Sequence, residues 1–108
     1  MRDRGLEELV LDDLGPLPGL SEKPMFGGLV WLLDGNMLCA VSHEGVMVRL
    51  GKGNDAWALA LSDVALMVMS GRSMPGWVRA GLDASADDDR RKRLLDAAVT
   101  FVGTLPPK

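Results

Sequence analysis

Cys39 and His43 have the residue types and spacing that most readily suggest metal chemistry, because a thiolate and an imidazole are ordinary zinc ligands. They form a C-x3-H pair and are the single cysteine and single histidine among 108 residues. A structural zinc site needs four such ligands, and no second pair follows. We therefore predict no metal site, an inert core thiol at Cys39 and a solvent-exposed turn at His43.

Two glycine-containing stretches raise the question of phosphate binding. Gly27 and Gly28 precede an apolar run, whereas a dinucleotide loop places its glycines between a strand and a helix. The stretch GVMVRLGKG, residues 45–53, has five residues between its first two glycines, where a P-loop has four, and no Ser or Thr follows Lys52. Neither stretch fits a phosphate loop. We expect the glycine pair to mark a bulge or a close approach of backbones within a strand.

A catalytic site would need a nucleophile, a base and a group that orients the base. One histidine and no tyrosine leave few candidates for the base. We therefore predict no catalytic residue, no cofactor and no enzymatic activity. The alternative to a protein-interaction domain is a small-molecule or anion-binding domain, which would use Arg49, Lys52 and Arg72 near one end of a sheet.

The elements that must position these residues begin with an amphipathic helix. Apolar residues three, four and seven apart predict that this helix ends near Leu14, and the Gly and Pro residues that follow predict a loop over residues 15–24. Asp34-Gly35 is a strong hairpin turn sequence between two apolar runs. Strands are predicted over residues 26–33, 37–42, 46–50, 64–69 and 77–80, the last as a brief edge strand after a loop at 70–76.

Two further helices are expected in the second half of the chain. The first spans residues 55–61, and the second begins with Ser85 as its cap and continues to Leu105 as one apolar stripe. In the charged run Asp87–Arg93, each acid stands four residues before a base. We therefore expect a self-paired, solvent-exposed helix face there, and not a nucleic-acid site.

The order of elements is α-β-β-β-α-β-β-α, which predicts an α+β fold of two layers, with a five-stranded, largely antiparallel sheet and helices packed on it. The length fits a single domain over residues 1–108. The first two strands are apolar on both faces, so the second face needs a cover of its own. A protein partner or a homodimer would supply that cover.

The overall charge argues against several classes of partner. With 15 acidic and 12 basic residues, the chain has no general basic field, so we expect no direct contact with nucleic acid. Its first ten residues are too charged for a signal peptide, and its apolar runs are too short to span a membrane. A single cysteine suits a reducing compartment. We expect a cytoplasmic protein without membrane contact.

Several separated motifs together resemble the N-terminal domain of the TfoX/Sxy proteins, as a short stand-alone member. They are KPMFGGLVWLLDGNMLCAV, GVMVRLG, GRSMPGWV and a last helix that ends FVGTLPPK, and they cover nearly the whole chain. The resemblance implies a secretion-chaperone-like fold and a role as a co-regulator of bacterial competence that acts through a protein partner. The family positions that match are Met25, Phe26, Gly27, Gly28, Arg49, Gly71, Arg72, Met74, Gly76 and Trp77.

The residues that we expect to contact a partner are Arg72, Met74, Trp77 and Arg49. Arginine, methionine and tryptophan are enriched in the cores of protein interfaces. We predict that the stretch from Arg72 to Trp77 acts together with the second apolar face of the first strands.

Overall fold

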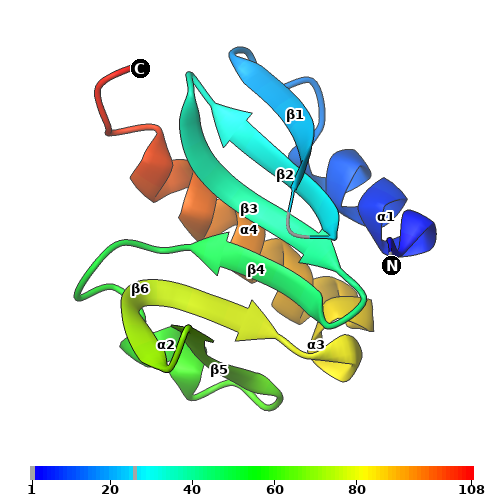
Figure 1. Cartoon of the computed structure of the whole chain (residues 1–108), viewed down its shortest axis with the longest axis vertical. Helices are drawn as coiled ribbons and strands as arrows, with labels where there is room; N and C mark the ends of the chain where they lie inside the picture. The colour runs from blue at the N-terminus through cyan, green and yellow to red at the C-terminus, as the bar shows by residue number, and fades with distance from the viewer. Residues whose placement is uncertain (1, 26) are drawn as a thin grey trace.

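The computed structural model describes residues 2–25 and 27–108, which form an α+β fold with one six-stranded antiparallel sheet (Figure 1). In chain order its elements are α1 (Arg4–Leu14), β1 (Leu20–Met25), β2 (Gly28–Leu33), β3 (Asn36–Ser42), β4 (Gly45–Arg49), α2 (Ala56–Leu59), β5 (Val64–Met69), β6 (Arg72–Ala80), α3 (Leu82–Ala86) and α4 (Asp88–Val102). The strand order across the sheet is β1-β2-β3-β4-β6-β5. Phe26, a position named by the resemblance, lies outside the described residues.

One apolar core joins the helices to one face of the sheet. Trp31, Cys39 and Val48 of the strands are buried in it together with Val10 of α1 and Leu95 of α4, and α2 and α3 each add an alanine. In Figure 1 α4 lies behind β3 and β4. Burial of each large apolar side chain stabilises the fold by about 1.5–3 kcal/mol. Among the described residues, no helix is long and apolar enough to cross a membrane.

The central hairpins follow the sequence closely. Asp34 and Gly35 both have positive φ, 51° and 83°, as a type I′ turn between β2 and β3 requires. The third predicted strand pairs back through a short turn at residues 43–44 as β4. The predicted meander of β2, β3 and β4 is therefore confirmed.

The prediction of a loop over residues 15–24 is wrong, because Leu20–Met25 forms β1 at one edge of the sheet, paired with β2. Four of its six residues are exposed, so the strand has no alternation of apolar and polar residues to reveal it. Pro24 lacks a donor N–H, and an edge strand tolerates this loss. The sheet consequently has six strands, and the predicted number of five is wrong.

The brief edge strand predicted at residues 77–80 is also wrong, as is the loop predicted at 70–76. β6 runs over nine residues and lies between β4 and β5. A tight turn at Ser70 and Gly71, with φ of 51° and 77°, connects β5 to β6. The Pro and Gly inside β6 made this strand look like a loop, although Gly76 serves to bend it.

The last predicted helix divides at Asp87 into α3 and α4. The cap of α4 is Asp87, whose carboxylate accepts a hydrogen bond of 2.8 Å from the Arg90 amide, so the prediction of Ser85 as the cap is wrong. The buried Ser85 hydroxyl instead donates to the Ala80 carbonyl at 3.1 Å and accepts from the Val46 amide at 3.0 Å. This side chain thereby joins α3 to β4 and β6.

The fully solvated, self-paired face predicted for Asp87–Arg93 is wrong at Arg91. Arg93 forms an exposed pair with Asp89 at 3.7 Å, as expected. Arg91 is buried and bonds instead to Asp13 of α1 at 2.6 Å. Spacing along α4 could not reveal this contact, because it depends on where α1 lies.

Candidate functional site

Within residues 2–25 and 27–108, no helix covers the face of the sheet opposite the core (Figure 1). We call this face the open face. One row of paired residues crosses all six strands on it: Lys23, Val30, Ala40, Met47, Arg79 and Ala65. Val30 and Met47 are buried although neither belongs to the core under the helices. The middle of this row is therefore apolar, as the first strands predict.

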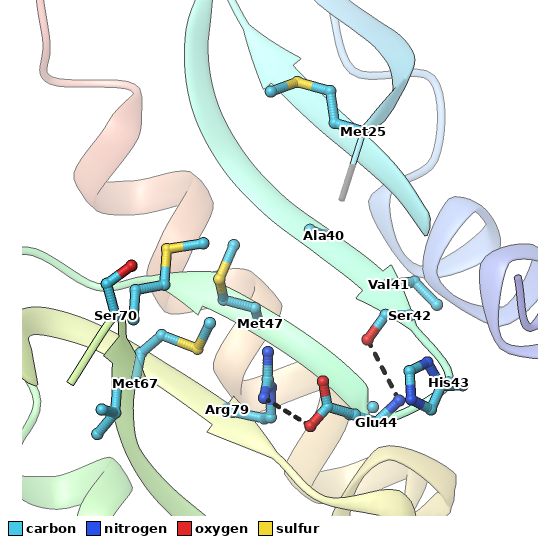
Figure 2. Close-up of a pocket in the computed structure, with 13 residues that line it drawn as sticks. Met25, Ala40, Val41, Ser42, His43, Glu44, Met47, Met67, Ser70 and Arg79 are labelled. Carbon is cyan, nitrogen blue, oxygen red and sulfur yellow. Dashed lines mark hydrogen bonds and ion pairs between the residues drawn. The ribbon is translucent and has the colours of Figure 1, made fainter. Parts of the chain in front are cut away.

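A hollow of about 450 Å³ lies on the open face. Its apolar wall includes four methionines, Met25, Met47, Met67 and Met69. Figure 2 shows Met47 and Met67 near Ser70 of the β5–β6 turn, with Met25 on the other side of the hollow. Because methionine side chains are unbranched and polarizable, they adapt to occupants of different shapes.

Polar groups stand at one end of the hollow. Arg79 Nη1 lies 3.2 Å from Glu44 Oε2, and both side chains are partly exposed, so the pair stabilises the fold by less than about 1 kcal/mol (Figure 2). In the described part of the chain, Arg79 Nε is buried without a hydrogen-bond partner. The Glu44 amide donates to Ser42 Oγ at 3.2 Å, which fixes the β3–β4 turn beside them.

Gly76 sets the position of the β5–β6 turn. Its φ is 85°, and a Cβ there would collide with the backbone of Gly51 and Lys52. Its carbonyl accepts hydrogen bonds from the amides of Leu50 and Gly51 at 2.7 and 3.2 Å, while its own amide donates to Asp55 at 3.1 Å. Beyond this point β6 leaves β4 and pairs with β5 alone. The bend thus allows the turn to border the hollow.

The comparison with protein families matches one family model, the TfoX N-terminal domain, over residues 12–102. The chain belongs to the TfoX N-terminal domain family. The matched range contains all six strands and therefore the whole open face. Comparisons with curated proteins and with solved structures gave no significant match, so the likeness to secretion chaperones stays a prediction.

Two of the four interaction residues predicted for this TfoX N-terminal domain lie together. The Arg49 guanidinium lies 5.4 Å from the centre of the Trp77 ring and 5.9 Å from that of Phe101 in α4. Trp77 is half-buried. Arg72 is exposed beside the β5–β6 turn, and Met74 is half-buried two residues further along β6. The predicted group is therefore spread along β6 and not gathered at one point.

The other family positions of the domain mostly shape its backbone. Met25 lines the hollow, and Gly71 forms the β5–β6 turn. Gly28 opens β2 where a Cβ would collide with the Val41 carbonyl oxygen, so the predicted close approach of backbones is confirmed there. Gly27 has a φ of 72° and is exposed.

Cys39 and His43 lie in different surroundings. Cys39 is fully buried in the core, where burial raises the pKa of its thiol, and His43 is exposed in the β3–β4 turn. Both placements agree with the sequence, and they keep the C-x3-H pair apart. Among the described residues, no group of three or more His, Cys, Asp or Glu side chains could hold a metal ion.

The cations expected to bind an anion do not line the hollow. Arg49, Lys52 and Arg72 are absent from its wall, whereas Arg79 belongs to it. Sequence reasoning missed Arg79, although it stands two residues after Trp77 and therefore on the same face of a strand. The strand predicted over residues 77–80 contains both side chains, so alternation alone could have identified Arg79.

Proposed function

We propose that this TfoX N-terminal domain is a protein-interaction domain without catalytic activity, and that it binds a protein partner through its open face. The observation that supports this proposal is the methionine-lined hollow in a sheet face that no described helix covers. Apolar surface of this kind is characteristic of interaction sites. Co-regulation of transcription in competence, which the family resemblance implies, is the role that we propose for such a contact.

The buried position of the single cysteine supports a function without catalysis. The cysteine points into the core on the other side of the sheet, and its raised pKa keeps the thiol protonated. Arg79 and Glu44 form a partly exposed ion pair at the hollow and can orient an occupant. A buried thiol and an ion pair at the hollow agree with a site that binds and does not make bonds.

A small molecule is the second candidate for the occupant. The hollow of about 450 Å³ lies within the range of about 300–1,000 Å³ that is usual for ligand sites. Native mass spectrometry of the purified protein tests this candidate directly. A retained small molecule that Val68→Glu removes would favour the ligand over the protein partner.

The protein-interaction proposal is tested with two exposed apolar residues that are matched in exposure. Val68 at the hollow and Leu82 on α3 are each 57% exposed. We expect a chemically cross-linked partner to be recovered with the wild-type chain and with Leu82→Glu, and to be lost with Val68→Glu. Recovery with Val68→Glu at the wild-type level, or equal loss with both variants, would refute the proposal.

A further inference from the structure

The strands carry a charge opposite to that of the whole chain. They contain four basic residues, Lys23, Arg49, Arg72 and Arg79, against one acid, Glu22. The chain as a whole has 15 acids and 12 bases. Glu22 pairs with Trp31, which belongs to the core, so its side chain lies on the helix side of the sheet. The acidic side chains are therefore concentrated in the helices and loops.

On the open face, basic side chains flank the apolar surface. Lys23 of β1 and Arg79 of β6 stand in the same cross-strand row, with Val30, Ala40 and Met47 between them. At a strand spacing of about 4.8 Å, four steps separate the two cations by about 19 Å. Glu44, in the β3–β4 turn, is the acid that lines the hollow, and it pairs with Arg79. The face is thus an apolar band between two cations, Lys23 on one flank and Arg79, paired with Glu44, on the other.

We infer that the partner binds with an acidic amphipathic segment. Its apolar side chains enter the hollow between Met25 and Met67, and its carboxylates lie near Lys23 and Arg79. This inference rests on the proposed function and adds the chemical class of the partner. Charged groups at the rim of an interface mainly set the association rate and the salt dependence.

The same charges argue against two other occupants. A second copy that docked by the same face would place Lys23 and Arg79 opposite a face with the same two cations. A nucleic acid would meet Glu44 beside Arg79 in the wall of the hollow, and this carboxylate repels phosphate groups. An acidic protein segment satisfies both the apolar hollow and the cations.

The test uses a display library of random 12-residue peptides selected against the full chain. We expect the enriched peptides to combine Asp or Glu with large apolar residues. A synthetic enriched peptide should bind about tenfold more weakly to Lys23→Glu/Arg79→Glu, and more weakly as NaCl rises from 50 to 500 mM. The control is Arg4→Glu/Lys92→Glu, which changes the net charge equally at exposed helix positions and should leave the affinity unchanged.

Lys23→Glu alone provides a second variant, because Lys23 is exposed and its replacement does not disturb the interior. Enrichment of neutral or basic peptides, enrichment of none, or equal losses in the test and control variants would overturn the inference. Dimerisation that Val68→Glu abolishes, or a gel shift of single-stranded DNA that Lys23→Glu abolishes, would overturn it as well. Binding that depends on Val68 but not on Lys23 or Arg79 refutes the acidic partner and leaves the proposed function intact.

Discussion

Arg91 carries its charge inside the protein and connects three helices. Its Nε and Nη2 donate to Asp13 and Asp88 at 2.6 and 2.7 Å, and its Nη1 donates to the Ser85 carbonyl at 3.0 Å. Burial opposes the charge, but the hydrogen bonds to Asp13 and Asp88 outweigh this effect and raise the pKa of Arg91. The guanidinium thereby holds α1 and α3 against α4.

Replacement of Arg91 by methionine should destabilise the protein strongly. The side chain of Asp13 is only 7% exposed, so it would lose its counter-charge in a buried position. We expect the free energy of unfolding, measured with urea, to fall by about 3–5 kcal/mol. Arg93→Met is the control, since its pair with Asp89 is exposed and its loss should cost less than about 1 kcal/mol. Equal effects of the two substitutions would contradict the structural role of Arg91.

Glu7 should make part of the stability depend on pH. Arg2 donates two hydrogen bonds to its carboxylate, at 2.8 and 3.0 Å, and this contact lowers the pKa of Glu7 from the ordinary 4.5. A lowered pKa in the folded state adds stability above the ordinary value, and this stability is lost as the pH falls through the folded value. The wild type should therefore be more stable than Glu7→Gln at pH 7, with a difference that shrinks below pH 4.5.

Urea unfolding of both proteins at pH 3, 4, 5 and 7 measures this difference. A gap between the two proteins that stays constant with pH would show that the Glu7 carboxylate is not responsible.

The bend in β6 depends on one residue that must be glycine. Gly76 combines a positive φ with close contact to the neighbouring backbone, whereas Gly53 has a similar φ of 87° and open space around it. Gly53→Ala should cost about 1–2 kcal/mol of backbone strain. Gly76→Ala should cost about 1–3 kcal/mol more, because the added methyl group is overpacked. Thermal and urea unfolding of both variants compare the two costs, and equal losses would contradict this account of the bend.

The sequence predicted well those elements whose structure is determined by residues close together in the chain. The Asp34-Gly35 turn and the apolar runs on either side of it determine β2 and β3 without help from the rest of the chain. β1 was missed because its exposed side chains give no alternation, and β6 was shortened because Pro75 and Gly76 are typical of loops. The edge position of β1 and the bend in β6 both depend on tertiary contacts, which local sequence patterns do not show.

The candidate site was predictable only in part for the same reason. Apolar residues on both faces of the first strands indicated a surface that needs a cover. The hollow could not be predicted, because it depends on β6 lying beside β4, whereas alternation with Trp77 could have identified Arg79. The burial of Arg91 likewise follows from the packing of α1 against α4, which no spacing within one helix reveals.

The two sides of the sheet differ in their cover and in their charge. Helices with most of the acidic side chains lie on one side of the sheet, and the apolar open face with Lys23 and Arg79 lies on the other. A domain that worked alone would gain stability by covering such a face with a helix of its own. We interpret the arrangement as a surface kept available for a partner.

Site-specific photocrosslinking in the native cells tests this interpretation most directly. Benzoylphenylalanine placed at position 68 lies at the hollow, and the same residue at position 82 lies on α3 with the same exposure. Irradiation should produce a covalent adduct with another protein from position 68 and none from position 82. Adducts from position 82 alone, adducts of equal yield from both positions, or adducts from neither would contradict the proposal that the open face is the interaction surface.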